Sequence, residues 1–153
     1  MTSRINSLLD RYGESHRHPI NKRIHWFCVP LIMWSLLGLL WLVPVPAGML
    51  TLNGAIIITV LAMIYYLNLA PGLAAGMLPV VIVMLAIVHA VENSGAGLLV
   101  VSVIVFVLAW IGQFIGHTIE GKRPSFLEDI RFLLIGPLWL LAFVYKRLGI
   151  RIG

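Results

Sequence analysis

Four of the five histidines in this sequence lie near the ends of two apolar segments. His16, His18 and His25 surround the start of the first apolar segment, and His117 lies near the end of the fourth. Imidazole is the commonest metal ligand in proteins. We therefore predict that His16, His25 and His117 form a metal centre, provided that the fold brings the two segments together.

Polar residues at helical spacing accompany two of these histidines. Gln113 and Glu120 stand at i−4 and i+3 from His117, and Asn21 stands at i−4 from His25, so that each pair shares a helix face. Glu120 is a candidate metal ligand, whereas Asn21 and Gln113 are candidates for orienting a ring nitrogen or a bound water. Two histidines with a carboxylate, or three histidines, leave coordination positions open, as in non-haem Fe(II) oxygenases. The alternative for Glu120 is a surface charge beside Lys122, as in many exposed ion pairs.

Arg123 follows the helix that carries His117. The arginine fork is well suited to hold a carboxylate by two hydrogen bonds. An amphipathic acid that entered from the membrane would meet Arg123 at the depth of the lipid headgroups. The alternative reading is a positive charge that anchors the chain on the cytoplasmic side.

The composition indicates what kind of protein must position these residues. The chain of 153 residues is 60% hydrophobic and 11% charged, against about 25% charged in soluble domains. We therefore expect an all-α integral membrane protein with a single transmembrane domain over residues 1–153. The basic residues flank apolar segments and do not form a surface interleaved with aromatics, which argues against nucleic-acid binding. With Cys28 as its one cysteine, the chain has no intramolecular disulfide.

Four apolar segments are long enough to cross a membrane, which takes about 20 residues. After a polar segment at 1–23, we expect these helices at about 24–43, 49–69, 72–91 and 96–119. Their short connections contain Pro and Gly, which favour tight turns between antiparallel helices. A fifth apolar segment, 130–145, contains Gly136-Pro137. Because Pro bends or ends a helix, we expect a re-entrant segment that returns there, or a short fifth membrane helix.

The basic residues determine the expected orientation. Of the 11 lysines and arginines, five precede the first helix, and positive charge is retained on the cytoplasmic side. Four crossings from a cytoplasmic N-terminal segment would place His25 and His117 at the same cytoplasmic face, beside His16. His89 would lie roughly 30 Å away across the bilayer, at 1.5 Å per helical residue.

Two spaced motifs resemble those of a known family. The first is Y-x-x-x-H-x-x-P-x-N-x-x-x-H at residues 12–25, and the second is W-x-x-Q-F-I-G-H-x-x-E-x-x-x-P at residues 110–124. Over nearly the whole chain the sequence resembles the membrane-bound 2-hydroxy fatty acid dioxygenases, formerly a domain of unknown function. The yeast member of that family acts in phytosphingosine breakdown and fatty acid alpha-oxidation.

The resemblance implies an Fe(II)-dependent enzyme that shortens a 2-hydroxy fatty acid by one carbon with O2. The motif histidines of the family fall on His16, His25 and His117, whereas His18 and His89 lie outside the pattern. The carboxylate and 2-hydroxyl of the substrate are expected to chelate Fe(II), with the acyl chain among the helices and membrane lipid around it. The short chain and loops favour a bacterial inner-membrane protein, or an endoplasmic-reticulum protein if the source is eukaryotic.

Three other classes of protein are alternatives. A histidine-box di-iron enzyme needs many more histidines than the five present. A b-type haem protein would need two axial histidines on facing helices, for which His25 and His117 are the candidates. A non-catalytic transporter or assembly factor would need no metal.

Overall fold

Six helices make up most of the chain in the computed structural model, which describes residues 2–47, 50–127, 129–150 and 152. The elements follow in the order α1 (Thr2–Glu14), α2 (Pro19–Trp41), β1 (Pro44–Ala47), β2 (Leu50–Asn53), α3 (Gly54–Leu69), α4 (Pro71–Asn93), α5 (Leu98–Glu120), the 3-10 helix η1 (Ser125–Leu127) and α6 (Phe132–Arg147).

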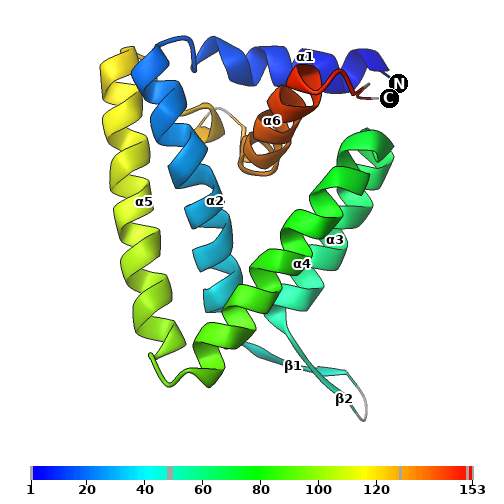
Figure 1. The fold of residues 1–153 in the computed structure, drawn as a ribbon, viewed down its shortest axis with the longest axis vertical. Coiled ribbons are helices and arrows are strands. Elements are labelled where there is room, and N and C mark those ends of the chain that lie inside the picture. The colour runs from blue at the N-terminus through cyan, green and yellow to red at the C-terminus, as the bar shows by residue number, and fades with distance from the viewer. Residues whose placement is uncertain (1, 48–49, 128, 151, 153) are drawn as a thin grey trace.

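Among the described residues, three helices are long and apolar enough to cross a membrane. These are α2, α4 and α5, each of 23 residues, or about 35 Å at 1.5 Å per residue, against about 30 Å of hydrocarbon core. The apolar helix α3 is shorter, with 16 residues. The structure thus has the apolar helices of a membrane-associated protein, and three of them reach the length of a full span where four were expected. The shorter α3 still leads the chain back toward the end of the molecule where α1 lies (Figure 1).

A two-stranded antiparallel hairpin shortens the second expected helix. Pro44 pairs with Asn53 in the ladder of β1 and β2, and the hairpin projects away from the helices (Figure 1). A helix was expected from residue 49, but residues 50–53 form a strand and α3 begins at Gly54, so the expected helix start is wrong. Residue 49 itself is not among the described residues. Proline lacks a backbone N–H and is unfavourable inside a helix. Asn53 caps α3, because its side chain accepts a hydrogen bond from Ile56 N.

The N-terminal segment contains a helix that the sequence pattern did not reveal. α1 carries Ile5, Leu9 and Tyr12 on one buried face, at the i, i+4, i+7 spacing of an amphipathic helix. It lies across the end of the molecule where α2 begins and α5 ends (Figure 1). Both described ends of the chain lie on this side.

The last apolar segment is a continuous helix. α6 runs through Pro137, so the expected reversal at Gly136-Pro137 is wrong and a short helix takes its place. Glycine at 136 permits close packing on α1, because a Cβ there would lie 2.9 Å from the Tyr12 hydroxyl. The segment therefore packs closely against α1, a contact that local sequence rules do not include.

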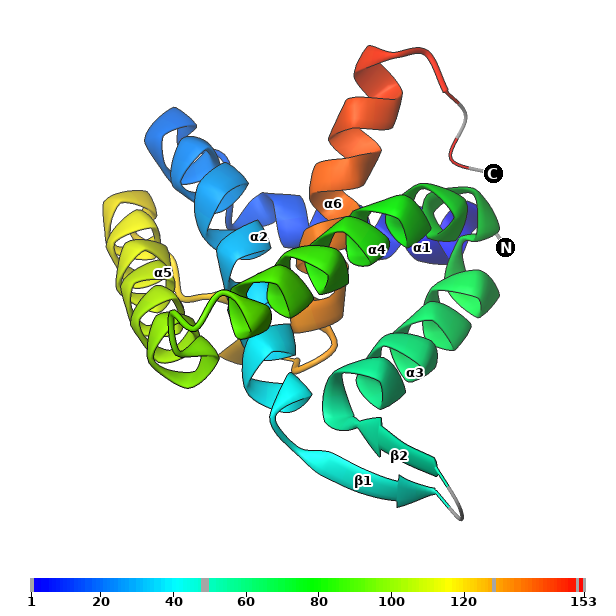
Figure 2. The ribbon, with the colours of Figure 1, turned by 60° about the horizontal axis from the view of Figure 1, so that its bottom comes forward.

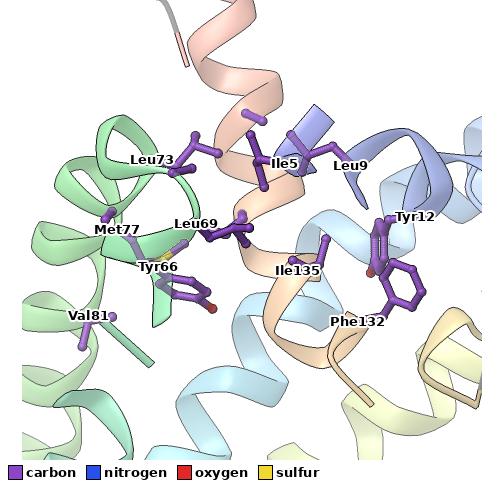
Figure 3. Close-up of a cluster of buried hydrophobic side chains, with 14 residues drawn as sticks. Ile5, Leu9, Tyr12, Tyr66, Leu69, Leu73, Met77, Val81, Phe132 and Ile135 are labelled. Atoms are coloured by element: carbon purple, nitrogen blue, oxygen red, sulfur yellow. The ribbon is translucent and has the colours of Figure 1, made fainter. Parts of the chain in front are cut away.

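The larger hydrophobic core lies around α6 (Figure 3). Tyr12 and Phe132 pack on one side of it, with ring centroids 6.1 Å apart. Residues of α3 and α4 pack on the other side, where Tyr66 donates a hydrogen bond to Leu134 O at 2.8 Å. This core fixes α1 and α6 against the apolar helices.

The helices α2 and α5 approach each other closely through glycines. A Cβ added at Gly112 would lie 2.7 Å from Cys28 Sγ, and one at Gly116 would lie 2.3 Å from Asn21 Oδ1. Small residues let helix backbones come together in this way. The close approach is what brings His25 of α2 beside His117 of α5.

Both described ends of the chain are expected on one side of the membrane. In a Cys28→Ser background, cysteines at Asn6 and Leu148, both exposed, should react with a charged thiol reagent from the same side. A cysteine at the exposed Ser94, in the turn between α4 and α5, should react from the other side. Labelling of Asn6→Cys and Leu148→Cys from opposite sides would refute this topology.

Candidate metal centre

Three buried histidines from three parts of the chain meet at one point. His16 lies in the turn between α1 and α2, His25 in the second turn of α2, and His117 in the last turn of α5. Their side chains offer nitrogens that all lie within 4.8 Å of one another. The three residues are only 1%, 1% and 5% exposed. They form a group that can hold one metal ion, which we call the histidine centre.

Backbone carbonyls orient two of these rings. His16 Nδ1 lies 2.6 Å from Tyr12 O, and His25 Nδ1 lies 3.0 Å from Asn21 O. Because a carbonyl only accepts, Nδ1 must carry the proton of each neutral ring, which leaves the Nε2 lone pair free for a metal. Burial lowers the pKa of His16 to about 4, so this ring is neutral at physiological pH.

The polar atoms of the histidine centre fit a bound metal. Within the described part of the chain, the buried atoms His16 Nε2 and His117 Nδ1 have no hydrogen-bond partner. A buried polar group without a partner costs about 1–3 kcal/mol, and coordination of a metal by these atoms would remove that cost. Imidazole donors suit Fe, Zn, Cu and Ni. The donor set therefore supports a metal centre and is compatible with iron.

The geometry does not suit a haem. The ring centroids of His25 and His117 are 4.9 Å apart and the two planes are perpendicular. Axial ligands must have the macrocycle between them, and these rings leave no room for it. The haem alternative is therefore disfavoured.

Asn21 and Gln113 lie beside the histidine centre. Asn21 is fully buried, and its Nδ2 donates to Ser15 O at 3.1 Å and to Glu120 Oε2 at 3.2 Å. Gln113 is buried and lines the same cavity as His25 and His117. Both candidates therefore lie next to the histidine centre.

Glu120 lies outside the three-histidine group and binds the backbone that leads into α2. Its Oε1 accepts from Arg17 N at 2.9 Å and its Oε2 accepts from His18 N at 2.7 Å. Lys122, the lysine considered as its surface partner, instead donates to Glu14 O at 2.8 Å. These contacts tie the turn that carries His16 to the end of α5.

The other candidates lie away from the histidine centre. Arg123 is exposed and is not among the cavity-lining residues. His18 caps α2, with its Nδ1 accepting from Ile20 N. His89 lies in the last turns of α4 and contacts Trp41, with ring centroids 5.9 Å apart. Its Nε2 lies 3.0 Å from Asn93 Nδ2. It lies outside the cluster, as expected.

Sequence reasoning missed several neighbours of His16. The Tyr12 ring stacks on the His16 ring at a centroid distance of 4.2 Å, and the Trp139 ring lies at 5.5 Å. Ser15 Oγ hydrogen-bonds with Ser125 Oγ and joins the turn to η1. The motif position of Tyr12 was a usable signal, whereas nothing in the sequence connects Ser15 with Ser125.

A cavity of about 290 Å³ opens onto the histidine centre. It is lined by residues of all six α-helices and of η1, and among its described lining residues none is a lysine, arginine, aspartate or glutamate. Along α2 the lining extends from His25 to Leu37, a distance of about 18 Å at 1.5 Å per residue. The site therefore combines a polar end with a long apolar interior.

Comparison with known proteins agrees with this arrangement. The family model described as 2-hydroxy-palmitic acid dioxygenase Mpo1-like matches residues 2–148. The chain is similar to the 2-hydroxy-palmitic acid dioxygenase MPO1 of Saccharomyces cerevisiae, with 29% identity over 150 residues that cover 93% of this chain and 80% of the yeast protein. No solved structure gives a significant match. Because the family model spans the histidine centre, the cavity and all six helices, the chain belongs to the Mpo1-like family.

Proposed function

We propose that this protein is an Fe(II)-dependent dioxygenase that shortens a 2-hydroxy fatty acid by one carbon with O2. The main observation that supports the proposal is that an apolar cavity opens onto three buried histidine nitrogens. The name of the yeast relative, a dioxygenase of 2-hydroxy-palmitic acid, supports the substrate class. A transporter or assembly factor gives no reason for three buried histidines that meet at one point.

His16, His25 and His117 would hold the iron, each through one ring nitrogen. When bound, Fe(II) would supply the redox chemistry with O2 and positions for the two neighbouring oxygens of a 2-hydroxy acid. The Nδ1 contacts of His16 and His25 hold the rings in the ligating orientation. Asn21 and Gln113 act as positioning residues. With the lost carbon released as CO2, the substrate itself supplies all the electrons that reduce O2.

The apolar cavity would receive the acyl chain. Its length along α2 of about 18 Å is close to half of the ~30 Å hydrocarbon core, the thickness of one leaflet. Val29, Met33 and Phe132 are among the side chains that would surround the chain and exclude water. The histidine centre, at the end where the basic N-terminal segment lies, is proposed to face the cytoplasm of a bacterium, with the spans in the inner membrane.

The test is metal-dependent turnover by purified protein. After removal of metal with a chelator, protein resupplied with Fe(II) should consume O2 with 2-hydroxypalmitate and yield the acid one carbon shorter. Protein resupplied with Zn(II) should bind the metal and remain inactive, because zinc has no redox chemistry. O2 uptake and product mass are measured together. Full turnover by the metal-free protein would refute the proposal.

Glu120→Gln is expected to weaken metal binding about 10–100-fold, the usual cost of losing a group that positions a ligand. The amide keeps one acceptor oxygen and loses the other, which loosens the turn that carries His16. Turnover at saturating iron should stay near wild type, measured as activity against iron concentration. Asp10→Asn, an exposed change on α1, is the matched control. A low turnover that excess iron does not restore would instead make Glu120 a ligand.

A further inference from the structure

The cavity is lined by three apolar side chains that are also exposed at the protein surface. Leu36 of α2 is 43% exposed, Ile58 of α3 is 39% exposed and Leu133 of α6 is 41% exposed, and all three line the cavity. A sealed pocket would bury such residues. We call this set the lateral rim.

The lateral rim lies where hydrocarbon would surround the protein. Leu36 stands about 16 Å from His25 along α2, at 1.5 Å per residue, within the span of 23 apolar residues. Other exposed residues of these helices are apolar too: Leu31 of α2 is 45% exposed and Leu61 of α3 is 56% exposed. α3 and α5 lie on opposite sides of α2 (Figure 2).

The cavity is also small for a long-chain acid. Its volume of about 290 Å³ is at the lower limit of ligand pockets, which hold about 300–1,000 Å³. It encloses the first part of a long acyl chain next to the histidine centre. A chain longer than the cavity would leave through an apolar opening, and the lateral rim provides one.

We propose that the acyl chain of the substrate passes through the lateral rim and ends in the lipid bilayer. This inference rests on the proposed function and adds the route of its substrate: the 2-hydroxy acid is taken sideways from the membrane, with no upper limit of chain length. The carboxylate end is held at the histidine centre, and only the first part of the chain is enclosed. A pocket that closed around the whole chain would select one length.

The inference predicts how turnover depends on chain length. For the wild type, kcat/KM should rise from 2-hydroxyoctanoate to 2-hydroxypalmitate and then stay within about threefold up to 2-hydroxytetracosanoate, because added carbons lie in lipid and gain no protein contact. A sharp fall beyond one length would overturn the inference.

Variants of the lateral rim give the decisive comparison. Ile58→Trp and Leu36→Trp should lower kcat/KM for 2-hydroxypalmitate roughly tenfold or more, since extra volume in the path of the chain is costly. 2-Hydroxyoctanoate, which fits inside the cavity, should lose less than about threefold. The controls are Leu61→Trp and Leu31→Trp on the same helices, exposed but not lining the cavity. Equal losses for long and short acids, at normal iron content, would overturn the inference.

A binding measurement, which needs no turnover, tests this inference separately from the proposed function. Retention of labelled 2-hydroxypalmitate by protein in lipid nanodiscs should fall in the rim variants and not in the controls. If the wild type converts no 2-hydroxy acid of any length, the proposed function fails, and the binding comparison alone decides whether the rim admits an acyl chain. Equal retention by rim and control variants would overturn the inference.

Discussion

Replacement of His117 by alanine is expected to abolish metal binding and to lower turnover by more than about a hundredfold. Loss of a group that merely orients a ligand costs about 10–100-fold, and loss of one of three ligands should cost more. The same result is expected for His16→Ala and His25→Ala, because all three nitrogens lie within 4.8 Å of one another. Iron per chain, measured on purified protein, is the primary readout.

The control for these variants is His89→Ala. His89 lies in the last turns of α4, against Trp41, and its loss should leave iron and turnover near wild type. Each variant must still insert and elute as folded protein, which the alanine changes permit because they remove a ring without adding volume. Full iron content in all three centre variants would remove the basis for the metal centre.

Palmitate, which lacks the 2-hydroxyl, is expected to react at least about a hundredfold more slowly than 2-hydroxypalmitate. A site built for two substrate oxygens strongly rejects an analogue that offers fewer, because its polar partners are then left unpaired. Besides the nitrogens His16 Nε2 and His117 Nδ1, the residues lining the cavity include the buried polar atoms Thr59 Oγ1 and Trp110 Nε1. The proposed function places both substrate oxygens at the histidine centre, so we expect the discrimination to arise there.

The measurement compares O2 uptake and product mass for palmitate, 2-hydroxypalmitate and 3-hydroxypalmitate. The 3-hydroxy acid has the same polarity as the 2-hydroxy acid but a different spacing of its oxygens, so it controls for solubility. It should react as poorly as palmitate. Similar turnover of all three acids would show that the hydroxyl is not recognised.

The meeting of the three histidines could be predicted from sequence because it depends on few facts. The spacing of apolar segments and the basic residues beside them place His25 and His117 at the same end of their helices. Helical spacing likewise placed Asn21 and Gln113 close to these residues, and in the structure both are buried there. Segment length and helical spacing are sufficient to predict which residues meet when the helices are regular and the connections are short.

Other features depend on contacts between distant residues, which a pattern does not contain. Glu120 had the right spacing for a ligand, yet its carboxylate binds backbone N–H groups 102 and 103 positions away. Gly136-Pro137 looked like a point of reversal, but α6 continues through it, and Gly136 packs closely against Tyr12 of the distant helix α1. Arg123 had the right chemistry for a carboxylate and lies exposed outside the cavity.

The separation of the three histidines along the chain has a consequence for biosynthesis. His16 and His25 leave the ribosome early, whereas His117 emerges only after α2, α3 and α4 have been made, since synthesis proceeds from the N-terminus. A truncated or half-inserted chain therefore lacks the third ligand and the Glu120 contacts that hold the turn of His16. Under the proposed function, metal loading would be a late step of maturation, and an incomplete chain would not carry a redox-active centre into the membrane.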